Sequence, residues 1–152
     1  MRQRLYLEDL HIGQKFVTAT TLVTEEAIKE FAARYDPQPF HLDDDAAKAT
    51  LFGGLAASGW HTAAMTMQLN VSSGPPLAAG IVGGGGEIQW PTPTRPGDVL
   101  RVEGEIMDII PSRSKPDRGM IVMRMETKNQ NGEVRQIIVM KLVVPRRAVA
   151  PA

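Results

Sequence analysis

Cysteine is absent from the 152 residues of this chain. Its absence excludes disulfide bonds, thiolate metal sites and cysteine nucleophiles together. An excess of charge of either sign is also lacking, because 17 Lys and Arg residues balance 17 Asp and Glu residues. Since binding to a phosphate backbone requires a surplus of basic charge, we do not expect nucleic acid to be a partner.

Long hydrophobic runs are missing as well. Residues 1–9 lack the apolar core that a signal peptide needs, and no stretch approaches a membrane span in length and apolarity. We therefore expect a cytoplasmic protein without a membrane partner. The length is typical of one domain that buries its own core. We predict a single domain over residues 1–152, with a flexible tail from about residue 145.

The N-terminal part contains a strand pattern, then a helical pattern that ends at prolines. Residues 17–23 are rich in Thr and Val, which predicts a strand. Residues 24–35 begin with a plausible N-cap, Thr24, and place apolar side chains at helical spacing. Pro37 and Pro39 each disfavour the helical conformation in the residue before them. We therefore expect residues 36–41 to be stiff and extended.

The middle and C-terminal parts predict helices followed by strands. The acidic residues 43–45 open a short helix, and residues 55–69, which carry no charge, predict a helix that is buried on most sides. A hairpin signal at Asn131-Gly132 lies among later strand patterns. The glycines at 83–86 indicate a bulge or a close backbone approach. The predicted strands cover residues 87–90, 99–106, 120–127 and 134–144. This order predicts an α+β domain, with an antiparallel sheet wrapped around one helix.

Asp36 and His41 carry the strongest local signal for chemistry. They place a carboxylate and an imidazole five residues apart on a segment that contains two prolines, which is one way to hold a general base and a general acid rigidly. Judged on spacing alone, a helix cap and an ordinary loop histidine are the more frequent explanation, because such pairs are common.

A wider pattern resembles the MaoC-like, (R)-specific enoyl-CoA hydratase domains. Members of this family carry the motif Asp-x-Asn-Pro-x-His-x-Asp at the end of their first helix, which Asp36, Pro39, His41 and Asp43 match. Further matches are Gly59 at the start of the uncharged helix, and Trp90-Pro91 through Pro96-Gly97-Asp98 before a strand. The resemblance covers residues 31–144, with the elements in the expected order, and it favours the functional reading of the Asp/His pair.

The resemblance implies a hot-dog fold and a role for three residues. Asp36 resembles the base that activates water for attack on C3 of a 2-enoyl thioester, and His41 the partner that holds this water and protonates C2. The backbone N–H of Gly59 resembles the donor to the thioester oxygen. The implied substrate carries coenzyme A or an acyl carrier protein, with no metal and no redox cofactor. Hot-dog relatives further imply a homodimer or a higher homo-oligomer.

Three positions depart from the family pattern. Gln38 stands where Asn is usual, and Ser58 stands where a His often precedes the glycine; we assign both to substrate binding. Met67 falls where some hydratases carry a serine near the carboxylate. The first two departures bear on the identity of the substrate, and the third bears on the protonation state of Asp36.

Other candidate sites are weaker. Arg113 and Lys115 belong to a basic loop that is either a solvated hairpin tip or a contact for coenzyme A phosphates. His41 with residues 43–45 could suggest a metal cluster, but an acidic first turn of a helix explains these carboxylates better. His61, on the apolar helix, is expected to be a packed core residue.

We therefore predict a hydro-lyase that adds water to a 2-enoyl thioester or removes it from the 3-hydroxyacyl product. Two alternatives stay open. A thioesterase of the same fold would direct water to the carbonyl carbon. A non-catalytic acyl-thioester binding protein would keep the cleft without turnover. Met67 favours this interpretation, and the Asp36/His41 pair opposes it.

Overall fold

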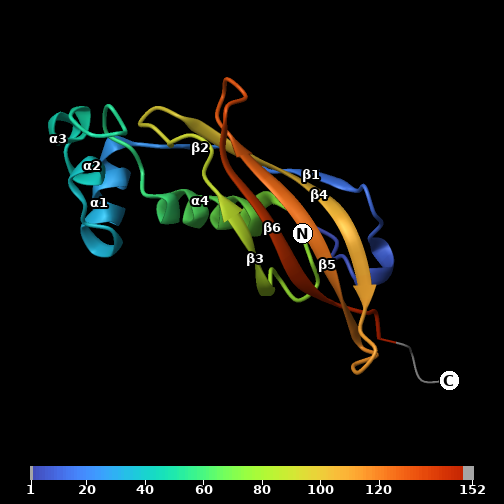
Figure 1. The fold of residues 1–152 in the computed structure, drawn as a ribbon. Helices are drawn as coiled ribbons and strands as arrows, with labels where there is room; N and C mark the ends of the chain where they lie inside the picture. The colour runs from blue at the N-terminus through green and yellow to red at the C-terminus, as the bar shows by residue number, and fades with distance from the viewer. Residues whose placement is uncertain (1, 149–152) are drawn as a thin grey trace.

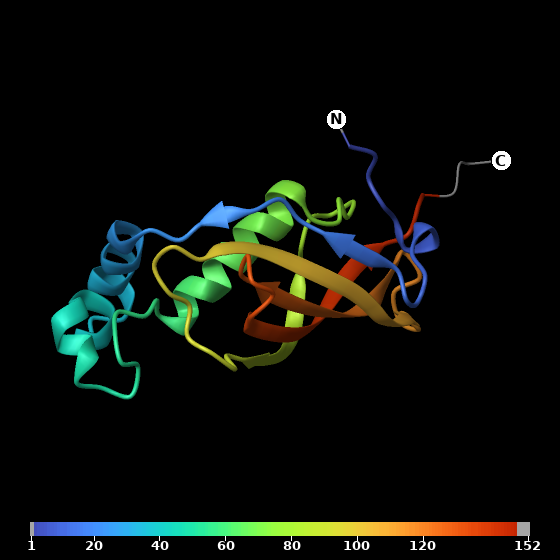
Figure 2. The same ribbon diagram turned by 90° about the horizontal axis from the view of Figure 1, so that it is seen from above.

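A long helix and an antiparallel sheet that wraps around it organise the molecule. The computed structural model describes residues 2–148. Helix α4 (Gly59–Ser73) runs along one face of the sheet, and the short helices gather beyond one end of it (Figures 1 and 2). These are α1 (Glu25–Tyr35), α2 (Pro39–Leu42) and α3 (Asp44–Lys48); a single turn of 3-10 helix, η1 (Leu7–Asp9), lies near the N-terminus. This is the α+β arrangement predicted from the sequence.

Six strands make the sheet, and each pairs with its neighbours in the antiparallel sense. Their order is β1-β4-β5-β6-β3, and β2 also pairs with β4. Strand β3 therefore lies at one edge, with a partner on one side within the described chain. The strands are β1 (Lys15–Val17), β2 (Thr21–Leu22), β3 (Gly83–Gln89), β4 (Val99–Pro111), β5 (Arg118–Lys128) and β6 (Val134–Pro145).

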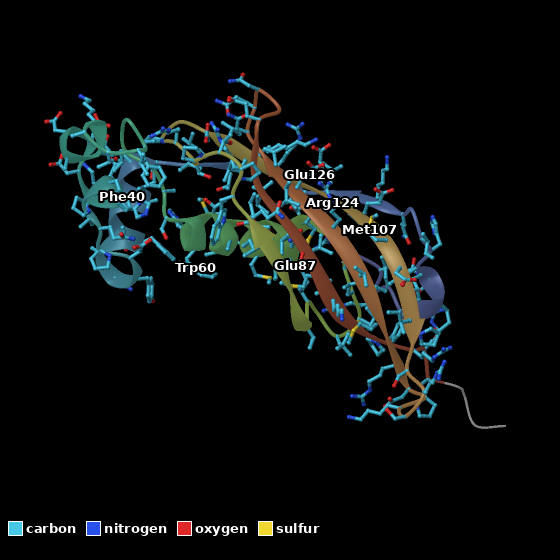
Figure 3. The ribbon with its side chains drawn as sticks, viewed as in Figure 1. Phe40, Trp60, Glu87, Met107, Arg124 and Glu126 are labelled. Atoms are coloured by element: carbon cyan, nitrogen blue, oxygen red, sulfur yellow. The ribbon has the colours of Figure 1, made fainter. Side chains whose placement is uncertain are left out.

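Alternation along the strands separates the core from the outer face of the sheet. In β5, Met123 and Met125 are buried against the helix side, whereas Arg124 and Glu126 point outward (Figure 3). This period of two is what a strand with one buried face requires. Met65 and Leu69 of α4 complete the same core from the other side.

The predicted first strand, residues 17–23, is interrupted. The structure has two short strands, β1 and β2, with Thr18 between them. The Thr18 hydroxyl accepts a hydrogen bond from Val102 N (2.9 Å), while Thr18 N donates to Val102 O (3.0 Å). A side-chain oxygen thus takes the place of a backbone acceptor here, and the regular ladder stops.

Two helix boundaries also differ from prediction. Residues 36–41 are not extended throughout, because Pro39 opens the single turn of α2. Proline suits this first position, where its fixed φ is already helical and its missing N–H would be unpaired anyway. Helix α4 begins at Gly59, the start that the family pattern implied, and not at residue 55, where the uncharged run begins. Ser58 is its N-cap and accepts a hydrogen bond from Trp60 N (3.3 Å).

Helix α4 is less enclosed than predicted. An apolar stripe along it faces outward, formed by Trp60, Met67 and Val71, which are 61%, 40% and 61% exposed. Figure 3 shows Trp60 near the start of this helix. The uncharged helix therefore has two apolar faces. One packs on the sheet, and the other is exposed in the single chain.

The glycine run and the tail complete the fold. The predicted bulge is present as a register shift between Gly83 and Gly85, and the Gly86 backbone lies so close to the Val139 carbonyl that a Cβ would collide with it. In the first part of the predicted flexible tail, Pro145 ends β6, Arg146 N donates to Asp117 O (2.8 Å) and Arg147 pairs with Asp9. Flexibility of the tail stays a prediction. Residues 149–152 lie outside the described range. No helix within residues 2–148 is long and apolar enough to cross a membrane.

Candidate functional site

Asp36 and His41 meet at the turn between α1 and α2. Asp36 caps the C-terminus of α1, and His41 lies in α2. The single helical turn opened by Pro39 brings the His41 ring back toward the carboxylate, so that Nε2 lies 3.3 Å from Asp36 Oδ2. The short helix that sequence reasoning missed is thus the element that brings the two predicted residues together.

His41 is buried and its orientation is fixed. Its side chain is 5% exposed, and Nδ1 lies 2.6 Å from the carbonyl oxygen of Ala56. Because a carbonyl only accepts, Nδ1 carries a proton and Nε2 is the nitrogen that faces Asp36. Phe40 packs edge-on against the imidazole and Phe52 lies on another side, with ring centroids at 4.6 and 5.6 Å.

Two further polar side chains converge on the Asp36 carboxylate. Gln38 Nε2 donates to Oδ1 (2.6 Å), and Ser58 Oγ donates to Oδ2 (2.8 Å). Partial burial acts to raise the pKa of Asp36, but these two hydrogen bonds and the nearby His41 outweigh it and hold the pKa below its ordinary value. Gln38 and Ser58, predicted to bind substrate, therefore contact the carboxylate in this structure. The sequence contained no signal for the Ser58–Asp36 bond, which spans 22 positions.

Substituting Ser58 by Ala should raise the pKa of Asp36, because a hydrogen bond to the charged form is lost. The carboxyl carbon of Asp36 would be titrated by NMR, and its midpoint should move to higher pH. Ser73→Ala is the matched control, since it removes a hydroxyl near the other end of α4 that donates to Leu69 O and accepts from Ala19 N but does not contact Asp36. A midpoint that stays in place in Ser58→Ala would refute this account of the carboxylate.

Gly59 is the first residue of α4, directly after Ser58. An N–H at this position has no partner within the helix and lies at the positive end of the helix dipole. The glycine lines the same pocket as His41. A Cβ at this position would lie 2.6–2.8 Å from three atoms of the Trp90 ring, so no side chain fits without a shift.

The pocket beside His41 and Gly59 has a volume of about 230 Å³. Aromatic and proline side chains form part of its wall, and hydroxyl groups and one guanidinium form the rest. Thr62 and Thr94 bond to each other inside it (Oγ1–Oγ1, 2.8 Å). Sequence reasoning had placed Trp90 and Pro91 in the family pattern but had found no role for Phe52, Thr62, Thr94 or Arg135, all of which line this pocket.

A buried ion pair fixes the loop that forms this wall. Arg135 binds Asp98 through two hydrogen bonds (Nε–Oδ2 2.9 Å, NH2–Oδ1 3.2 Å) and also donates to Thr92 Oγ1 (3.0 Å). Burial acts to raise the pKa of Asp98, but hydrogen bonds from Arg135 and from the backbone of Arg95 lower it overall. Asp98, the last residue of the Pro-Gly-Asp pattern, therefore holds this loop in place by binding Arg135.

The remaining predicted residues lie elsewhere. Arg113 and Lys115 are exposed near the β4–β5 turn, at the opposite end of the molecule from α1–α3 (Figures 1 and 2). The structure therefore does not bring them to the pocket of their own chain; Arg113 lines a separate pocket of about 470 Å³.

Met67 lies on the exposed stripe of α4, and His61 is buried and stacked on Phe31 (4.7 Å between centroids), as predicted for a core residue. Within residues 2–148, no three His, Asp or Glu side chains are grouped to hold a metal ion.

Comparison with known proteins gives one family. The model described as "MaoC like domain" matches residues 9–130. Two relatives match most of the chain. The protein YdeM from Bacillus subtilis (strain 168) is 32% identical over 82% of this chain and 87% of its own length. A 3-hydroxybutyryl-CoA dehydratase from Methylorubrum extorquens is 27% identical over 73% of this chain and 69% of its own.

Solved structures confirm the hot-dog fold predicted from the resemblance. A MaoC-like dehydratase from Rhodospirillum rubrum is 56% identical, with a TM-score of 0.94 over 95% of this chain and 99% of that one. The R-hydratase PhaJ1 from Pseudomonas aeruginosa is 25% identical, with a TM-score of 0.74 over 98% of this chain and 95% of that one.

Proposed function

Because the chain belongs to the MaoC-like dehydratase family, we propose that it is a hydro-lyase that interconverts a 2-enoyl thioester and a 3-hydroxyacyl thioester. The observation that carries the proposal is the Asp36–His41 pair, 3.3 Å apart beside a pocket that Gly59, the first residue of α4, also lines. The dehydratase and R-hydratase relatives support the same reaction class. We propose coenzyme A or an acyl carrier protein as the carrier, with no metal or redox cofactor.

The reaction divides between the two side chains. Asp36, kept ionised by Gln38 and Ser58, takes a proton from water as the water oxygen bonds to C3. The C2–C3 π electrons move toward C2 and the thioester oxygen, where the Gly59 N–H stabilises the developing enolate charge. His41 takes part as the imidazolium, with one proton on Nδ1 and a second on Nε2, and it gives the Nε2 proton to C2. Proton transfer from Asp36 to His41 across their contact then restores both groups, and dehydration is the reverse.

The Ser58 hydroxyl bears on the non-catalytic alternative. Met67, at the position where some hydratases carry a serine, points outward on α4, yet Asp36 still receives a hydroxyl hydrogen bond from Ser58. The carboxylate is therefore held ionised and in a fixed orientation, the state in which it can accept a proton, and this supports turnover.

A panel of trans-2-enoyl-CoA thioesters tests the proposal. The purified protein should abolish the absorbance of the conjugated double bond and release no free thiol. Thiol release would indicate a thioesterase instead. Binding without loss of either group would indicate an acyl-thioester binding protein.

We further propose that two copies of the chain associate, as the resemblance implied. Among residues 2–148, strand β3 has a neighbouring strand on one side alone, and the apolar stripe of Trp60, Met67 and Val71 lies open on α4. Light scattering at micromolar concentration should give at least twice the 16.6 kDa chain mass. A stable monomer under these conditions would contradict the proposal. Contacts of Arg113 and Lys115 with a carrier would then be made at the pocket of a second subunit.

A further inference from the structure

Trp90 forms one wall of the pocket, and three contacts hold its ring. Its Nε1 donates to Gln136 Oε1 (3.0 Å), and Gln136, fully buried, donates in turn to Thr66 Oγ1 of α4 (3.2 Å). Trp60 packs edge-on against it, with centroids 5.3 Å apart. The ring also covers Gly59 so closely that a Cβ there would collide with it. Trp90 cannot move aside without breaking its hydrogen bond to the buried Gln136.

Other side chains of the pocket wall are also held by contacts of their own. Phe52 packs against Phe40 (4.8 Å between centroids), and Thr62 and Thr94 are buried with their hydroxyls bonded to each other. Arg135 is held by Asp98. These held polar groups lie beside the apolar surface that Phe52, Trp90 and the prolines give the pocket. The volume of about 230 Å³ lies below the roughly 300–1,000 Å³ typical of ligand sites.

We propose that Trp90 is a specificity-determining residue that limits this site to short acyl chains. The inference rests on the proposed function, since it assumes that the thioester carbonyl lies at Gly59 and that the acyl chain extends from there into the pocket. Trp90 takes no part in proton transfer. It limits the size of the space available to the acyl chain beyond C3.

A chain-length series tests the role of Trp90. The wild-type protein and Trp90→Ala would be assayed with trans-2-enoyl-CoA thioesters of four, six and eight carbons. Because each methylene that a pocket cannot accept costs about tenfold or more in kcat/KM, wild-type kcat/KM should fall at least tenfold from four to eight carbons. Trp90→Ala should raise the eight-to-four ratio by at least tenfold. Trp90→Phe keeps an aromatic wall and should stay near the wild-type ratio.

Saturated acyl-CoA thioesters provide a readout that needs no chemistry. The Kd values of the four-carbon and eight-carbon ligands would be measured by competition. In Trp90→Ala, the affinity for eight carbons relative to four should rise, as the ratio of kcat/KM values should. Thermal midpoints identify variants that fail to fold, in which case Trp90→Leu replaces Trp90→Ala.

The outcomes separate this inference from the proposed function. Equal wild-type rates on four and eight carbons, or a ratio that Trp90→Ala leaves unchanged, would overturn the role of Trp90 while leaving the hydro-lyase in place. A folded wild-type protein that hydrates none of these thioesters would overturn both.

Discussion

Replacing Asp36 by Asn is expected to lower the hydration rate by roughly 10²–10⁴-fold, the range that a positioned general base contributes. The amide is nearly isosteric but cannot take a proton from water. His41→Ala should cause a loss of similar size, because it removes the group that protonates C2. Initial rates would be followed through the absorbance of the conjugated double bond.

Asp43→Asn is the matched control for this experiment. Asp43 lies in the same motif, but its side chain caps α3 by accepting from Asp45 N (3.1 Å), and Asn is an equally good cap. This variant should keep both its stability and its rate. The assignment of the site would fail if Asp36→Asn, folded as judged by its thermal midpoint, turned over the best substrate at a near-native rate.

Replacing Gly59 by Pro should lower kcat by a further 10²–10³-fold relative to Gly59→Ala, the effect of losing one oxyanion donor. Both substitutions add a Cβ that meets Trp90, but only proline removes the N–H. Proline is compatible with the first position of a helix, and Ser58 before it has the extended ψ of 140° that precedes proline well.

The pair of variants separates catalysis from packing. If Gly59 serves only to let Trp90 approach α4, both variants lose thermal stability, and their folded fractions turn over equally fast. If the N–H stabilises the enolate, Gly59→Pro falls well below Gly59→Ala at equal folded concentration. Rates and thermal midpoints measured together decide between these outcomes.

Much of the architecture could be predicted from local patterns. The strand at 120–127 was found because apolar side chains alternate along it, and the strand at 134–144 because it follows the hairpin signal at Asn131-Gly132. The observed β5 and β6 extend these ranges by only a few residues. The first strand was predicted as continuous because the hydrogen bonds between Thr18 and Val102 span 84 positions, which no local pattern reveals. The short helix α2 was missed for another reason. Proline disfavours the helical conformation in the residue before it, and the whole segment was therefore predicted to be extended, although Pro39 itself suits the first position of a helix.

By itself, the sequence determined the chemistry available to this protein. It supplied Asp36, His41 and Gly59 in a family motif, excluded thiol chemistry and indicated a sheet around one helix. The tertiary structure decided how these groups are arranged. It placed Ser58 and Gln38 on the carboxylate, directed His41 Nδ1 to the Ala56 carbonyl, and closed the pocket with Trp90 and the Thr62–Thr94 pair. The physical reason is that motif residues lie close together in the chain, whereas a carboxylate's hydrogen-bond donors and a pocket's walls come from distant segments that meet only when α4 packs into the sheet.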